Sequence, residues 1–282
     1  MFVNEFLGYC GARNLSALTI RQYRMNLKEF YGFMAERNKD VDDATPQDVA
    51  SFQLSLSQRI KPQSVNACLS AVRSYFGYMV KFQGMAANPA VQVSSCKTAK
   101  LLPKYVPQNV MERILCELAT NTARQRRNFA LLALFYMTGA RCAEVVSLSV
   151  SDLNFDECRI LLYGKGRKQR YVPMCAKLRH ALLSYLQVRP VSASNSIFLQ
   201  VSGEPLNEWQ IRAIVSRILA KYVPKEMAHP HILRHTFATV LLNHGKPIEQ
   251  ISRWLGHTSI AVTERYLTIA ANPTTNNFNG VF

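Results

Sequence analysis

The segment 231–266, HILRHTFATVLLNHGKPIEQISRWLGHTSIAVTERY, constrains the fold of this chain more than any other stretch. Apolar residues recur in it at helical spacing, and glycines stand where the apolar runs stop, as they do after the last turn of many helices. We therefore predict three consecutive helices. The first ends at His244-Gly245, the second runs from Pro247 to Gly256, and the third follows directly.

Polar side chains occupy positions in this segment that a plain helical core does not need. His231 and Arg234 are three residues apart and so share one face of the first helix. His257 lies just past the end of the second helix, and Tyr266 follows nine residues later on the third. The spacing predicts that these side chains converge on one site.

The motifs HxLRHTFAT and LGH, with a tyrosine nine residues after the LGH histidine, resemble the signature of the tyrosine recombinase (phage integrase) family in its Xer-like form. TGARCAEVVSL resembles the family's TGLRxSE box, and the GKGRK turn places Lys165 at the family's β-hairpin lysine. The resemblance implies a site-specific DNA recombinase that cleaves and rejoins DNA through a 3′-phosphotyrosyl intermediate and so integrates, excises or resolves DNA.

The resemblance assigns the central chemistry to four side chains. Tyr266 would attack the phosphodiester as the nucleophile, and Lys165 would protonate the leaving 5′-oxygen. The guanidinium groups of Arg141 and Arg234 would bind the non-bridging phosphate oxygens, for which their planar, permanent charge is suited.

Histidines and one carboxylate complete the predicted site. His231 would be a base or hydrogen-bond partner beside the nucleophile, and His257 would donate a further bond to the phosphate. Glu144 can be a buried ion-pair partner of Arg141, and we expect it to hold that arginine in place for phosphate. His235 is interpreted as a structural histidine within reach of the tyrosine or its helix.

The charge of the chain favours a polyanionic partner. Its 34 Lys and Arg exceed its 18 Asp and Glu, which gives a net charge of +16. Charge alone does not separate DNA from RNA or acidic lipid. The sequence shows no signal peptide and no apolar run near the roughly 20 residues of a membrane span. We expect a cytoplasmic protein that binds a double-stranded DNA recombination site and no membrane.

The sequence predicts neither a metal nor a cofactor. The 7 cysteines are scattered without a CxxC or Cys/His ligand pattern, and most are expected to be reduced apolar fillers. Asp and Glu form no cluster of the kind that a two-metal nuclease needs. GKGRK lacks the glycine spacing of a phosphate-binding Walker loop.

Periodicity along the chain predicts a mainly α fold with a small β-sheet in the catalytic domain (α+β). Residues 1–90 read as a helical bundle, 91–106 as a linker, and 107–282 as the remaining domain with its C-terminal tail. CRILLYGKGRKQRYVPM alternates as two strands around a turn. The resemblance implies that the bundle is the core-DNA-binding (SAM-like) domain and that the two domains form a C-shaped clamp around duplex DNA.

Basic residues on helix faces, in the linker and at the hairpin turn are candidate contacts to the DNA backbone. For any one of them, a merely solubilising role fits equally well, and an exposed hairpin tip is the alternative for the last three. They are Arg21, Arg24, Lys28, Lys61, Arg73, Lys97, Lys100, Lys104, Arg167, Lys168 and Arg170.

Two other functions stay open at this point: a type IB topoisomerase-like enzyme and a catalytically silent DNA-binding relative. The compact helical N-terminal domain favours recombination, and the filled catalytic positions argue against lost catalysis. The resemblance implies a homotetramer on two duplexes, with or without a second recombinase or accessory protein. The C-terminal tail either packs onto a neighbouring protomer or frays, and the target sequence is not encoded in backbone contacts.

Overall fold

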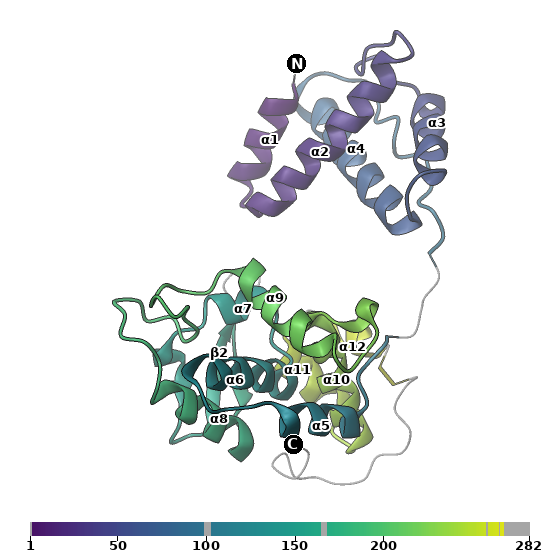
Figure 1. The fold of residues 1–282 in the computed structure, drawn as a ribbon. Coiled ribbons are helices and arrows are strands. Elements are labelled where there is room, and N and C mark those ends of the chain that lie inside the picture. Colours follow the sequence, from purple (N-terminus) through teal and green to yellow (C-terminus); the bar gives the residue numbers. More distant parts are fainter. Residues whose placement is uncertain (1, 99–102, 165–167, 258, 265, 268–282) are drawn as a thin grey trace. The chain divides into compact units, whose positions relative to one another are not determined.

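The computed structural model describes residues 2–98, 103–164, 168–257, 259–264 and 266–267. The chain divides into two compact units, Met1–Lys100 and Leu101–Phe282 (Figure 1). The predicted mainly α fold with a small antiparallel sheet is confirmed. Among the described helices, none combines the length and the apolar character needed to cross a bilayer.

The first unit is helical throughout its described elements, and α2 packs against the other three helices. Aromatic rings fill its core: the Phe30 ring lies 5.0 Å from Phe52 and 5.8 Å from Phe76. The helical bundle predicted for residues 1–90 begins with α1, and Leu18 at the start of α2 is an exposed apolar side chain, at 74%. The helices are α1 (Val3–Ala12), α2 (Ala17–Ala35), α3 (Pro46–Ser57) and α4 (Pro62–Phe82).

Side-chain caps fix where these helices begin. The Ser16 hydroxyl accepts a hydrogen bond from the Thr19 amide at the start of α2. At the start of α3, Thr45 and Asp48 bond reciprocally to each other's backbone amides, which satisfies donors that the first turn leaves unpaired. Asp48 also accepts a bond of 2.8 Å from the Lys39 ammonium, so one carboxylate anchors both the helix and the preceding loop.

The second unit is built around α6, whose residues from Ala130 to Thr138 are all buried. Helices α8, α9 and α10 pack against it. The helices are α5 (Gln108–Glu117), α6 (Ala123–Thr138), α7 (Cys142–Val146), α8 (Ala176–Leu186), α9 (Glu208–Leu219), α10 (Pro230–Asn243), α11 (Ile248–Leu255) and α12 (Ala261–Glu264), with 3-10 turns at Val150–Asp152 and Lys225–Met227.

A three-stranded antiparallel sheet, ordered β1-β2-β3, lies beside the helices. Its strands are β1 (Leu153–Asn154), β2 (Arg159–Tyr163) and β3 (Gln169–Pro173). Ile160 pairs with Val172, and Leu162 pairs with Arg170. Because alternate residues of a strand point to the same face, Arg170 projects to the side on which Val172 is buried.

Two glycines at helix ends let side chains from other elements pack closely against the backbone. Gly139 ends α6 at φ +62°, and a Cβ there would lie 2.6 Å from Phe237 Cδ1 and 2.8 Å from Leu255 Cδ2. Gly256 ends α11 at φ +65°, where a Cβ would lie 3.0 Å from Arg170 Cδ. Both positions need a left-handed backbone and the absence of a side chain.

Candidate functional site

A surface cavity of about 630 Å³ lies where α7, the β2–β3 hairpin and the end of α11 meet. It unites three motifs that are far apart in the sequence: the TGAR box, the GKGRK turn and the LGH motif. Arg253 also contributes to the wall, although the sequence prediction omitted it. Its place in the last turn of α11, just before LGH, is the signal that could have indicated it. The lining residues are Arg141, Gly164, Lys168, Gln169, Arg170, Arg253, Gly256, His257 and Val262.

Arg141 stands at the N-cap of α7 and lines this cavity with a side chain that is 38% exposed. Its Nη1 donates to Glu144 Oε1 at 2.9 Å, and its Nη2 donates to the Gly256 carbonyl at 3.3 Å. Arg141 and Glu144, three residues apart in the sequence, thus form a direct ion pair. The arginine is held from one side and keeps an accessible side.

Arg234 on α10 is almost wholly buried, at 2% exposure. Its Nη1 donates to the Gly139 carbonyl at 2.8 Å and its Nη2 to the Leu255 carbonyl at 2.6 Å. Both acceptors lie at helix C-termini, where the helix dipole favours a cation. Burial, and then the charge of Arg141, lower the pKa of Arg234 to about 9, so the site disfavours its positive charge until an anion arrives.

Arg170 was predicted either to contact DNA or to lie exposed at the hairpin tip, and its side chain is not exposed. Its side chain is 8% exposed, and its Nη1 and Nη2 each lie 2.7 Å from the Glu144 carboxylate. Its Nε donates to the Trp254 carbonyl at 2.6 Å. Burial raises the pKa of Glu144, but hydrogen bonds and charge from Arg170, with those of Arg141, outweigh burial and lower it. The sequence signal was the strand period: Arg170 shares a face with the buried Val172.

Tyr266 is buried at 1% exposure, and its hydroxyl lies 2.6 Å from His235 Nδ1. The structure thus places His235 at this hydroxyl, as the sequence interpretation allowed. His231 is exposed one turn earlier on α10, with its ring centre 4.6 Å from that of His235. His257 lines the cavity, and its Nδ1 lies 2.7 Å from Thr263 Oγ1. Tyr266 itself is not part of the cavity wall.

Several predicted residues fall outside the described part of the chain. They are Lys100, Lys165 and Arg167. The two residues that flank the hairpin tip are described: the Gly164 amide donates to the Lys168 carbonyl at 2.8 Å, and both residues line the cavity. The two described ends of the GKGRK motif, Gly164 and Lys168, therefore lie at the edge of the same cavity.

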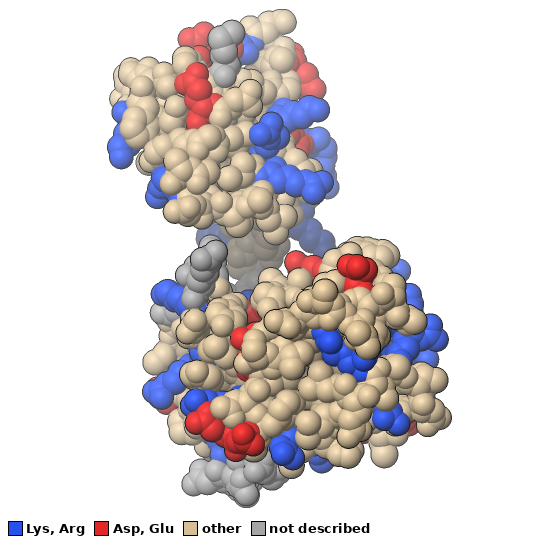
Figure 2. All heavy atoms as spheres, turned by 90° about the vertical axis from the view of Figure 1, so that its left-hand side faces the viewer, with Lys and Arg blue, Asp and Glu red and all other residues tan. Residues whose placement is uncertain are grey.

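Most of the other predicted DNA contacts have exposed side chains, and Figure 2 shows Lys and Arg side chains on the surface of both units. Arg73 differs, since its guanidinium donates to the Ala90 and Val93 carbonyls and fastens the segment after α4. Lys104 pairs with Glu226 at 3.6 Å. The exposed ones are Arg21, Arg24, Lys28, Lys61, Lys97, Lys104 and Lys168.

The cysteines and acidic residues of the described segments provide no metal centre. No group of three or more His, Cys, Asp or Glu side chains lies close enough there to hold an ion. The 7 cysteines are all free thiols, and Cys10, Cys68, Cys142 and Cys175 are buried in the two cores. Burial raises the pKa of the Cys175 thiol, which agrees with the role of an apolar filler.

Comparisons with known proteins agree over nearly the whole chain. Residues 104–272 match the Phage integrase family, and residues 3–83 match the phage integrase N-terminal SAM-like domain. A relative named tyrosine recombinase XerC, from Bacillus pumilus (strain SAFR-032), is 31% identical over 268 residues, which covers 92% of this chain and 88% of the relative.

Two solved structures are similar to the model in fold. The crystal structure of XerA recombinase is 27% identical, with a TM-score of 0.54 over 94% of this chain and 92% of the other. The XerH site-specific recombinase bound to its palindromic difH substrate, a post-cleavage complex, is 21% identical, with a TM-score of 0.80 over 95% of this chain and 81% of the other. At that identity, the second likeness concerns the fold alone.

Proposed function

This chain belongs to the phage integrase family and is a site-specific tyrosine recombinase, and from that premise we propose that Tyr266 cleaves DNA to form a 3′-phosphotyrosyl link. One observation carries the proposal. Two arginines from distant motifs, Arg141 and Arg234, are fixed around the end of α11, beside a cavity that the LGH histidine also lines. Their guanidinium groups suit the two non-bridging oxygens of a phosphodiester.

The proposed reaction is an in-line displacement at phosphorus. The Tyr266 oxygen bonds to the phosphorus as the bond from phosphorus to the 5′-oxygen breaks, and Lys165 gives its proton to that oxygen. Arg141, Arg234 and His257 stabilise the negative charge that gathers on the phosphoryl oxygens. The covalent link retains the energy of the phosphodiester, so a 5′-hydroxyl from another duplex can reverse the step without ATP.

The buried position of Tyr266 marks a resting arrangement of the nucleophile. Its hydroxyl is engaged by His235, and Tyr266 is not among the residues that line the cavity around Arg141. We propose that bound DNA draws Tyr266 away from His235 and that His231, exposed one turn earlier, then accepts the phenol proton. Bringing the nucleophile to a fixed phosphate is a positioning step of the kind that controls such reactions.

The larger assembly is proposed on the family premise. Residues 1–90 would bind core DNA, 91–106 would act as a tether, and 107–282 would catalyse, so that the two domains close as a C-shaped clamp on duplex DNA in the cytoplasm. Four protomers would hold two duplexes, with the C-terminal tail as a link between neighbours. The exposed cations on α2 are the contacts to the backbone that this arrangement needs.

A covalent trapping assay tests the chemistry. Wild type and Tyr266→Phe are incubated in EDTA with nicked duplexes made from DNA flanking the gene, and the products are separated on a denaturing gel. We expect an adduct with wild type alone, on particular fragments, while both proteins bind those fragments equally. If the protein binds DNA but forms no adduct on any fragment, the proposed enzymatic activity is contradicted. If Tyr266→Phe forms an adduct, another residue is the nucleophile.

A further inference from the structure

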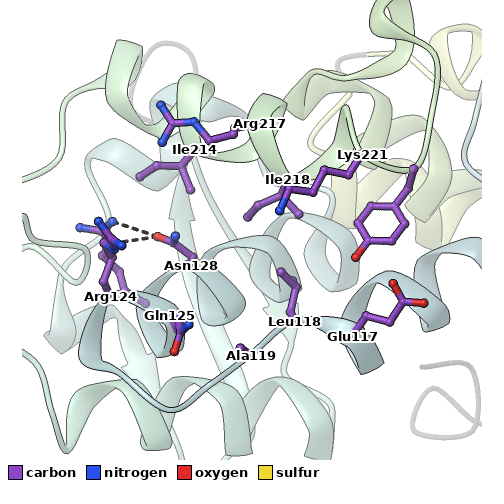
Figure 3. A pocket seen from close by; sticks show the side chains of 12 residues that line it. Glu117, Leu118, Ala119, Arg124, Gln125, Asn128, Ile214, Arg217, Ile218 and Lys221 are labelled. Carbon is purple, nitrogen blue, oxygen red and sulfur yellow. Dashed lines mark hydrogen bonds between the residues drawn. The ribbon is translucent and has the colours of Figure 1, made fainter.

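A second cavity, separate from the one around Arg141, has several basic residues in its wall. It lies between the end of α5, the first turns of α6 and the C-terminal half of α9. Its volume is about 400 Å³, and none of its lining residues belongs to the cavity around Arg141. Figure 3 shows Arg124 reaching it from α6 and Arg217 and Lys221 from α9 and the residues after it. The lining residues are Glu117, Leu118, Ala119, Arg124, Gln125, Arg127, Asn128, Ile214, Arg217, Ile218, Lys221 and Tyr222.

The charge of this cavity is not balanced. Its wall holds four cationic side chains and one carboxylate. That carboxylate, Glu117, lies 3.9 Å from Arg113, outside the cavity. Within the described residues, no ion pair is formed by Arg124, Arg127, Arg217 or Lys221. The cavity therefore offers excess positive charge to an anion.

Arg127 makes the strongest case, because it is buried as well as unpaired. It is 7% exposed, and its guanidinium donates to the Leu199 carbonyl at 2.9 Å and to Asn128 Oδ1 at 3.1 and 2.9 Å. All of these acceptors are uncharged. Burial lowers its pKa; Tyr185 opposes this, and the nearby charge of Arg124 adds to it. A buried cation without a counter-charge is costly, and a bound anion would remove that cost.

We propose that this cavity binds a phosphate group at a site separate from the catalytic one. The exposed side chains of Arg124, Arg217 and Lys221 would contact the phosphate oxygens directly. Arg127 would add positive charge from its buried position in the cavity wall. Arg124 and Gln125 from the first turn of α6 line the cavity, so the positive end of that helix dipole lies beside it, although a capping box already pairs the Gln125 amide with Thr122. A backbone phosphate of DNA is the source we favour, which rests on the proposed function. Free phosphate shares the same chemistry.

The test compares a double variant at the cavity, Arg217→Ala with Lys221→Ala, with a matched double on α8, Lys177→Ala with Arg179→Ala. The control removes the same charge from exposed positions outside the cavity. First, thermal unfolding of the full chain is followed in phosphate and in chloride at equal ionic strength. Second, binding of a labelled duplex is measured by fluorescence anisotropy over a range of salt concentrations.

We expect phosphate to raise the Tm of wild type and control saturably and to have little effect on the cavity variant. For DNA, the slope of log affinity against log salt should become shallower by about 1 to 2 in the cavity variant, because each lost phosphate contact removes about 0.9. A phosphate effect without a slope change identifies free phosphate as the ligand. No phosphate effect, together with a slope equal to that of the control, overturns the site.

Asn128→Asp gives an independent test, because it adds a carboxylate while keeping the size and shape of the side chain. The new carboxylate would stand where the amide oxygen now accepts from Arg127 and would neutralise it. We expect a higher Tm in chloride and a weaker effect of phosphate, and an undiminished phosphate effect would contradict the role of Arg127. Formation of the covalent adduct is measured separately. If the wild type responds to phosphate but forms no adduct, the recombinase chemistry is refuted and the phosphate site still stands.

Discussion

The guanidinium of Arg170 meets the carboxylate of Glu144 through two parallel hydrogen bonds of 2.7 Å. The same carboxylate accepts from the side chain and the backbone amide of Arg141, at 2.9 and 2.7 Å. Arg170 also holds the Trp254 carbonyl near the end of α11. The buried side chains of Glu144 and Arg170 thus join the three chain segments that form the cavity around Arg141.

We predict that Arg170→Met lowers the free energy of unfolding by about 3–5 kcal/mol, because it leaves a buried carboxylate without its main partner. Arg170→Lys should recover part of that stability through its charge. It should still form the covalent adduct about 100-fold more slowly, because the fork that aligns the three segments is lost. Urea unfolding and adduct kinetics on the same preparations measure the two effects. Arg179→Met, on the surface of α8, is the control, and an equal loss there would remove the special role of Arg170.

Gly139→Ala should destabilise the second unit by about 2–4 kcal/mol. The left-handed backbone costs a non-glycine residue about 1–2 kcal/mol, and the new Cβ would press on the rings and methyls of α10 and α11. Gly32→Ala is the matched control, because nothing lies within 4 Å of its Cβ position and α2 is helical there. That change should stabilise by about 0.5–1 kcal/mol. Thermal unfolding of both variants measures these effects. Similar Tm values would show that the side chains around Gly139 move aside at little cost in free energy.

The acid stability of the first unit should depend on Asp48. A hydrogen bond from Lys39, followed by one from Thr45, lowers the pKa of Asp48 to about 2. Because the folded pKa lies below the unfolded one, these bonds stabilise the fold above about pH 4 and are lost as the pH falls toward 2.

Asp48→Asn should therefore lower the Tm at pH 6, and its difference from wild type should shrink between pH 4 and pH 2. Circular dichroism melts across that range measure the difference. Asp43→Asn, at an exposed position, serves as the control. A difference that stays constant with pH would mean that packing at Asp48, and not its charge, supplies the stability.

Lys165 can be tested chemically although it lies outside the described residues. Lys165→Ala should form little adduct on DNA with an ordinary 5′-oxygen at the cleavage site, because no acid then protonates the leaving group. The same variant should recover on a substrate with sulfur at that position, since a thiolate leaves without a proton. Adduct yields on the paired substrates provide the measurement. Equal failure on both substrates would mean that another residue is the general acid.

The sequence by itself determined the helical character of most of the chain, the hairpin and the spacing of the motifs. Apolar periodicity, caps such as Thr45 with Asp48, and the glycine that ends α11 act over a few residues, so their consequences can be derived locally. Arg141 in the TGAR motif and Arg234 in the HxLRH motif could also be identified from sequence, because the resemblance covers short, contiguous stretches.

Only the tertiary structure decided which partner each polar side chain meets. Arg170 was predicted on an exposed turn, yet strand register turns it inward to Glu144, which lies 26 residues earlier. The hydroxyl of Tyr266 is engaged by His235, and Arg127, which forms no ion pair within the described segments, acquires its importance from burial. Contacts of this kind depend on the folding together of distant segments, where burial makes hydrogen bonds and charges far stronger than local sequence can indicate.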